Sequence, residues 1–133
     1  MRQKPALTSS DVQKMAVACK VEAEKNNWTL TIAIVDDAGY LLYLERMDGA
    51  SALTARIAAG KAETAAISRR PSKFWEERIK ERPGFAKAPI STPMQGGVPI
   101  MVEKDCVGAI GVSGAQSHED EQVANAGVAA LGA

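Results

Sequence analysis

Two pairs of β-rich runs, each joined by a very short turn, constrain the fold of this chain more than any other feature. In the first pair, residues 28–35 and 40–47 flank the turn sequence Asp36-Asp37-Ala38-Gly39. In the second pair, residues 98–103 and 106–112 are joined at Lys104-Asp105. Because such turns leave no room for a crossover helix, each pair predicts a hairpin of antiparallel strands.

The first of these runs is apolar on both of its faces. Leu30, Ile32 and Ile34 alternate with Ala33 and Val35, which predicts a central strand covered on both sides. In the last run, glycines recur at positions 108, 111 and 114. Glycine weakens a strand unless something approaches closely. We therefore expect contact with the closing helix, with a neighbouring subunit or with a ligand.

Helical periodicity fills the segments around the two hairpins. It predicts helices over residues 8–26, 51–70 and 72–80 and a closing helix from Ser117. Capping boxes are expected at Ser10 with Gln13 and at Ser117 with Asp120, and Ser72 is expected to cap the third helix. Arg69 and Arg70 are expected in the last turn of the second helix, whose many alanines indicate close packing. Proline and glycine make residues 81–97 an irregular loop of a length that is often functional.

This order of elements predicts one α+β domain over residues 1–133, with helices flanking a central antiparallel sheet. Sixteen basic residues balance sixteen acidic ones, so neither nucleic acid nor an anionic membrane is an expected partner. The polar start and the absence of a long apolar run lead us to expect a cytoplasmic protein. Cys19 and Cys106 lack any ligand or redox spacing, and we interpret both as buried apolar residues.

Few side chains suggest chemistry. His118 is the single histidine, so no metal site is predicted; we interpret it as a surface residue, with an axial ligand or general base as the alternative. Lys61 shares a helix face with apolar residues, so it either extends past them to water or carries a lowered pKa suited to a carbonyl. Residues 69–87 are basic, with Phe74, Trp75 and Phe85 interspersed. That segment is either a solvated face or a clamp for a carboxylated planar ligand.

Several blocks together resemble the GlcG/HbpS-like family, which includes the C-terminal domain of PduO adenosyltransferases. They are Arg46-Met47-Asp48-Gly49-Ala50, Lys61-Ala62-Glu63-Thr64-Ala65-Ala66, Gly96-Gly97-Val98-Pro99-Ile100, residues 107–114 and Asp120-Glu121. The resemblance implies a profilin-like fold, assembly into dimers or larger rings and, in some relatives, binding or degradation of haem. Certain haem-binding relatives use a histidine in the first helix, where this chain offers only Met15 and Cys19.

Our leading hypothesis is a small-ligand-binding protein, for haem or another carboxylated molecule, that is accessory to small organic acid metabolism. The expected pocket lies between the second helix, the glycine-rich loop and the basic segment. Its predicted ligand-binding residues are Arg46, Asp48, Lys61, Thr64, Arg69, Arg70, Gly96, Gly97 and Pro99. One alternative is an enzyme that isomerises or degrades a small organic acid or haem, with Lys61 or Glu63 as acid and base. Another is a non-catalytic homo-oligomeric scaffold that meets its copy through the alanine and glycine faces.

Overall fold

The computed structural model describes residues 1–132 and has the predicted order of elements. Its elements are α1 (Ser9–Lys25), β1 (Thr31–Asp36), β2 (Leu41–Arg46), α2 (Ala52–Ser68), α3 (Ser72–Glu81), the 3-10 helix η1 (Pro83–Lys87), β3 (Gly97–Val102), β4 (Asp105–Ser113) and α4 (Ser117–Leu131). The two hairpins form one antiparallel sheet in the order β2-β1-β4-β3. The predicted α+β class and element order are confirmed.

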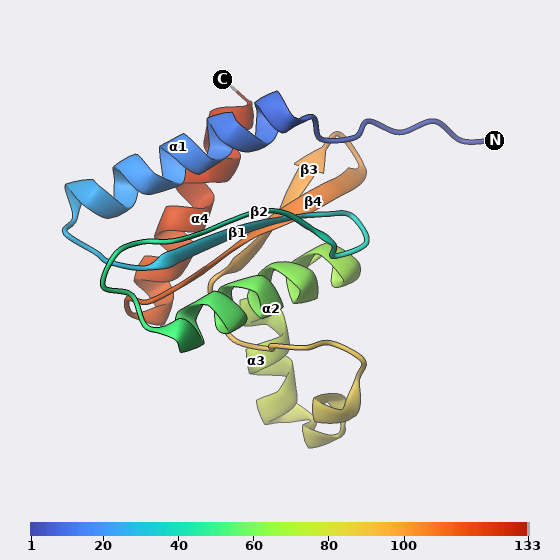
Figure 1. Cartoon of the computed structure of the whole chain (residues 1–133). Helices are drawn as coiled ribbons and strands as arrows, with labels where there is room; N and C mark the ends of the chain where they lie inside the picture. The colour runs from blue at the N-terminus through green and yellow to red at the C-terminus, as the bar shows by residue number, and fades with distance from the viewer. Residues whose placement is uncertain (133) are drawn as a thin grey trace.

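Helices cover both faces of the sheet (Figure 1). Helices α1 and α4 pack on one face over a core that includes Met15, Leu30, Ile32 and Ile110. Helix α2 packs on the other face, where its alanines lie against Ala33, Val35 and Ala109. Strand β1 is buried along almost its whole length, as predicted from its two apolar faces. Helix α3 and η1 project away from the sheet beyond α2 (Figure 1).

The glycine-marked strand β4 lies inside the sheet, between β1 and β3. A Cβ at Gly111 would lie 2.1 Å from the Ala58 carbonyl oxygen of α2, and one at Gly108 would lie 2.3 Å from the Val35 carbonyl oxygen. These glycines therefore let α2 and the neighbouring strand approach closely. The expectation that this strand meets a second copy is wrong, because both of its edges are already paired.

Both capping boxes lie at other residues than predicted. Thr8 and Asp11 form the box at the start of α1, and Gln116 and Glu119 form the box of α4. The Ser10 box fails because Ser10 is already inside the helix. Several residues share the right spacing near each helix start, so spacing alone does not fix which of them is the cap.

The two arginines after α2 lie outside the helix. Arg69 is its C-cap and adopts a left-handed conformation, with φ of 57°. The predicted placement in the last turn is therefore wrong. Ser72 does not cap α3 either, because Pro71 is the cap residue and the Ser72 hydroxyl donates to the Met94 carbonyl oxygen in the loop before β3. Within residues 1–132, none of the helices has the length and apolar character that crossing a membrane demands.

Candidate functional site

A buried ion pair links helix α2 on one face of the sheet to helix α4 on the other. The Lys61 Nζ of α2 donates to the Asp120 Oδ2 at 3.1 Å and to the carbonyl oxygen of Val112 at 2.9 Å. Both charged residues are only 2% exposed. The other Asp120 oxygen accepts a hydrogen bond from the Ala115 amide at 2.9 Å. The prediction that Lys61 reaches past apolar neighbours into water is therefore wrong.

The glycine-rich loop closes over this pair. Gly96 has a φ of +132°, and a Cβ there would lie 2.7 Å from the Lys61 Nζ. A Cβ at Gly97 would lie 2.2 Å from the Lys61 carbonyl oxygen. Two glycines are thus required because only a bare backbone fits against α2 at this point. We call Lys61, Asp120, Gly96 and Gly97 the closed junction.

Two side-chain hydroxyl groups form hydrogen bonds that hold the chain in place around the closed junction. The Ser72 hydroxyl, at the start of α3, accepts a hydrogen bond from the Gly97 amide at 2.8 Å. The Thr64 hydroxyl of α2 accepts one from the Thr92 amide at 2.9 Å. Both hydroxyl-bearing residues are fully buried. The loop before β3 is therefore held to α2 and α3 rather than free to open as a lid.

Burial dominates the electrostatics of Asp120. Removal from water raises the pKa of its carboxyl group, against the opposing effects of the Lys61 charge and of the backbone amides of Ala115 and Gly114. The pair is thus a costly arrangement that depends on both partners staying in place.

The predicted ligand-binding residues separate into different regions. Lys61, Thr64, Gly96 and Gly97 come together around the closed junction. Pro99 lies in β3 and is partly buried. The rest lie elsewhere: Arg46 and Asp48 are exposed at the end of β2, Arg69 lines a different cleft, and Arg70 lies over the Phe74 ring.

The two proposed acid–base residues also separate. Lys61 points into the closed junction. Glu63 lies beside Gly39 of the β1–β2 turn, where a Cβ on that glycine would meet the Glu63 Cγ at 2.8 Å. The two side chains therefore leave α2 in different directions.

An open cleft lies next to the closed junction, between α3 and α4. Its volume is about 480 Å³. It is lined by Pro71, by Lys73, Phe74, Glu77, Arg78 and Glu81 of α3, and by Glu121 of α4. Glu121 follows Asp120 directly, and Pro71 precedes Ser72. The walls of this α3–α4 cleft are thus continuous with the residues that fix the closed junction.

Arginines and aromatic rings alternate along the projecting segment. The Arg70 guanidinium lies 4.3 Å from the centre of the Phe74 ring, and that of Arg78 lies 5.1 Å from it. Trp75 packs between Phe74 and Phe85, with ring centres 5.2 and 5.6 Å away. Such stacking stabilises a cation without neutralising it. Arg78 therefore keeps its positive charge at the wall of the α3–α4 cleft.

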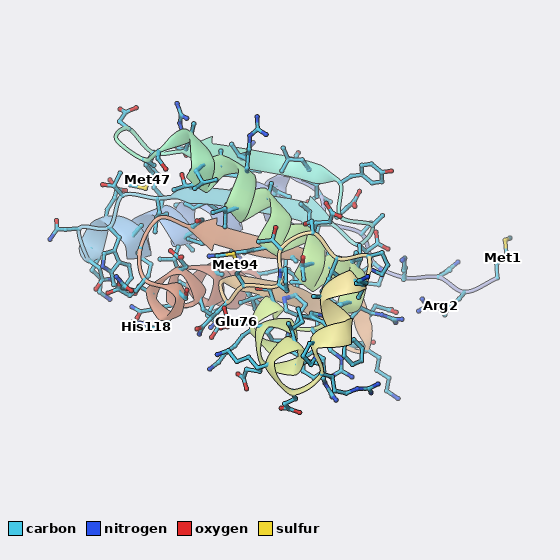
Figure 2. The ribbon with its side chains drawn as sticks, turned by 90° about the horizontal axis from the view of Figure 1, so that it is seen from below. Met1, Arg2, Met47, Glu76, Met94 and His118 are labelled. Atoms are coloured by element: carbon cyan, nitrogen blue, oxygen red, sulfur yellow. The ribbon has the colours of Figure 1, made fainter. Side chains whose placement is uncertain are left out.

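Gln95 connects α3 to α4 beside this cleft. Its backbone N–H donates to the Glu76 Oε1 at 3.4 Å, and its side-chain Nε2 donates to the Glu121 Oε1 at 3.2 Å. His118 is exposed and lies one helical turn before Glu121. Figure 2 shows His118 and Glu76 on the same side of the molecule. Sequence reasoning identified His118 but gave no signal that it lies near a cleft.

A second cleft, of about 320 Å³, lies at the far end of α2. Arg69 lines it together with Cys106 and with the ion pairs Arg2–Asp105 and Lys4–Asp37. Both cysteines are free and buried, as predicted. Burial raises the pKa of the Cys19 thiol to about 12, so this thiol stays protonated at neutral pH. Among residues 1–132, no three His, Cys, Asp or Glu side chains gather in a way that could hold a metal ion.

Comparison with known proteins identifies the family. The model of a family described as "Haem degrading protein HbpS-like" matches residues 7–129. The chain belongs to the HbpS-like family. It is 42% identical to Protein GlcG of Escherichia coli K12 over 114 residues, which is 85% of each chain.

Solved structures agree with this HbpS-like assignment. A double mutant of HbpS from Streptomyces reticuli is 34% identical, with a TM-score of 0.92 over 100% of this chain and 92% of that one. A complex of PduOC with haem is 22% identical, with a TM-score of 0.85 and 95% of each chain covered. At that identity the PduOC likeness shows the fold alone.

The first helix of this HbpS-like chain offers no ligand for haem iron. Met15 and Cys19 are fully buried in the core between α1 and the sheet. The α3–α4 cleft offers the Phe74 ring and the cations Lys73 and Arg78. Its lining also holds three carboxylates, those of Glu77, Glu81 and Glu121. His118 offers the one imidazole, a turn away from the cleft.

Proposed function

We propose that this HbpS-like chain binds a flat small molecule that carries carboxylates, with haem as the first candidate, in the α3–α4 cleft. The observation that carries the proposal is the Phe74 ring with the Arg70 and Arg78 guanidiniums stacked on it at the edge of a 480 Å³ hollow. Ligand sites combine an apolar surface with a few placed charges in this way.

The roles of the wall residues follow from their chemistry. Pro71 and the part of Phe74 that lines the cleft provide apolar contact for a ligand. Arg78 provides two parallel N–H donors for a carboxylate. Lys73 now pairs with Glu77 at 3.8 Å, but both side chains are about half exposed, so the pair contributes little and Lys73 can turn to a ligand.

Haem would add an iron that accepts a nitrogen ligand. His118 is the residue of this chain that can supply one beside the cleft, from the first turn of α4. The carboxylates of Glu77, Glu81 and Glu121 make the rest of the wall acidic. They disfavour a second anionic group far from Lys73 and Arg78, and so restrict how a ligand with two carboxylates can lie.

The enzyme alternative has no comparable support. Lys61 is already engaged by Asp120, and Glu63 faces another side of α2. The two residues therefore do not meet around one substrate.

The test uses two probes that differ only in the metal. Hemin and iron-free protoporphyrin IX are titrated separately into the purified protein, followed by the Soret band and by tryptophan quenching. We expect saturable binding of both with one site per chain. Arg78→Gln should weaken both at least tenfold, whereas His118→Ala should weaken hemin and change its Soret position without affecting protoporphyrin IX.

Lys80→Gln is the matched control, because Lys80 is an exposed cation of α3 that does not line the cleft. It should bind both probes like the unaltered protein. The proposal fails if neither probe binds saturably, or if Arg78→Gln and Lys80→Gln have equal effects. If protoporphyrin IX binds but His118→Ala leaves hemin binding unchanged, only the role of His118 as the iron ligand is refuted.

A further inference from the structure

The cleft at the far end of α2 is built from four separate parts of the chain. We call it the Arg69 cleft, after the C-cap residue of α2 that lines it. Arg2 and Lys4 reach it from the N-terminal segment, Asp37 from the β1–β2 turn and Asp105 from the start of β4. Figure 1 shows this end of α2, both hairpin turns and the N-terminal segment at the same end of the molecule. Charged side chains that are distant in the sequence thus converge on one hollow of about 320 Å³.

Arg69 is the cation that this cleft leaves unpaired. Arg2 pairs with Asp105, and Lys4 pairs with Asp37. Among residues 1–132, no carboxylate lies within ion-pair distance of the Arg69 guanidinium. The two ion pairs also reduce the repulsion that Asp37 and Asp105 would exert on an anion. Three cations and two carboxylates therefore leave one positive charge for an anion to neutralise.

The backbone at Arg69 is unfavourable for a residue with a side chain. Its φ of 57° and ψ of 33° are left-handed, a conformation that glycine usually supplies at the end of a helix. Arginine is therefore less stable at this position than glycine would be. Strained residues that persist cluster at ligand clamps. The turn also separates two neighbouring arginines, because Arg70 lies over the Phe74 ring while Arg69 lines its own cleft. Both observations indicate that Arg69 is retained for its charge at this cleft.

Uncharged residues make up the rest of the Arg69 cleft. Ala66 and Ile67, from the last turn of α2, add apolar surface, and Ile67 is 41% exposed. Cys106 is buried, and its thiol donates to the carbonyl oxygens of Ala66 and Gly108. Burial raises the pKa of this thiol, so it stays protonated at neutral pH. The cleft therefore offers one unpaired cation beside a short apolar wall.

We propose that the Arg69 cleft binds a small monocarboxylic acid with a short carbon chain. The Arg69 guanidinium donates two parallel N–H bonds to the carboxylate, and Ala66 and Ile67 contact the carbon chain. A single negative charge matches the one unpaired cation, whereas a dianion would bring a second charge toward Asp37 and Asp105. A water molecule takes up about 30 Å³, so the hollow has room for a ligand of about ten non-hydrogen atoms.

The test is a titration with butyrate, followed by nitrogen–proton correlation NMR of the Cys106 backbone amide, which reports on the cleft in every variant. One bidentate pair at a partly exposed site predicts saturable binding, with a dissociation constant of about 1–10 mM. Butyramide has the same shape without the charge and should produce no saturable shift. Arg69→Gln should weaken butyrate binding at least about tenfold. Arg56→Gln is the matched control, because Arg56 is an exposed arginine of α2 outside the cleft, and it should bind butyrate like the unaltered protein.

Arg69→Gly keeps the test decisive if Arg69→Gln fails to fold. Glycine adopts the left-handed conformation without strain, so this variant should fold and still lose butyrate binding. The proposal is overturned if butyrate gives no saturable shift, if butyramide binds equally well, or if the Arg69 variants bind butyrate as tightly as Arg56→Gln does. Each of these outcomes leaves the porphyrin proposal standing, because the Arg69 cleft and the α3–α4 cleft share no residue.

Discussion

Replacing Lys61 by Met tests how the closed junction is held together. Met has nearly the length of Lys and fills the same space between α2 and Gly96, so the change removes the charge and little else. Asp120 then keeps its hydrogen bond from the Ala115 amide but loses its cation. A buried acid without a partner either stays ionised at a high cost or takes up a proton.

The free energy needed to protonate Asp120 limits how much stability the variant loses. The ordinary pKa of an Asp carboxyl group, 3.8, lies about three pH units below pH 7, and each unit corresponds to about 1.4 kcal/mol. Lys61→Met should therefore lower the free energy of unfolding by about 3–4 kcal/mol at pH 7. A chain of 133 residues loses about 0.28 kcal/mol per degree near its melting temperature, so Tm should fall by about 10–15 °C.

The pH dependence follows from the direction of the pKa shift. Burial already raises the pKa of Asp120 in the intact protein, and removing Lys61 raises it further. The folded variant then binds a proton more tightly than its unfolded chain does. Its stability is fully present below pH 3.8 and is lost as pH rises through the raised pKa. The deficit relative to the unaltered protein should therefore be largest at pH 7 and shrink toward pH 4.

Urea unfolding at pH 4.5 and pH 7, followed by circular dichroism, measures both effects. Lys61→Met/Asp120→Asn should recover most of the loss at pH 7, because the neutral amide keeps the Ala115 bond and needs no cation. Lys80→Met, at an exposed lysine, should change stability by less than about 0.5 kcal/mol. A Lys61→Met loss below about 1 kcal/mol, or one that grows toward acid pH, would refute the reasoning.

Three further predictions concern backbone approach, capping and thiol burial. Gly97→Ala should cost at least about 3 kcal/mol in urea unfolding, because its Cβ would lie 2.2 Å from a carbonyl oxygen of α2 that cannot move alone. Thr8→Ala should cost about 1 kcal/mol, or about 4 °C in Tm, through loss of the bond to the Asp11 amide at 3.1 Å. Cys19 and Cys106 should resist Ellman's reagent at pH 8 in the native protein and both react after unfolding, since burial raises the pKa of each thiol.

The sequence predicted the fold well because its strongest signals are local. Short turns determine antiparallel pairing, and an apolar run on two faces determines a central strand such as β1. The signals that failed are those shared by several neighbouring residues. Thr8 rather than Ser10 caps α1, since the spacing rule fits both starts and only the tertiary structure selects one.

The site was less predictable because its parts depend on long-range contacts. Lys61 and Asp120 are 59 residues apart, and nothing in the sequence pairs them. Gly96 and Gly97 are predicted to bind a ligand, but whether they leave room for a ligand or for a helix depends on how closely α2 approaches. Lys61 itself occupies the space that these two glycines leave. The open cleft lies beside α3.

The residues that carry the family resemblance therefore mostly build the closed junction and do not line the α3–α4 cleft. Four of its five sequence blocks supply the closed junction or the strand beneath it: those beginning at Lys61, Gly96, Val107 and Asp120. The α3–α4 cleft takes five of its seven lining residues from α3 and a sixth, Pro71, from the residue that caps it, and neither α3 nor Pro71 belongs to a block of the resemblance. Only Glu121 belongs to both. Relatives that share the closed junction can therefore differ in this cleft. What this chain binds has to be tested at α3 itself, by measuring how Arg78→Gln changes the binding of the two porphyrin probes.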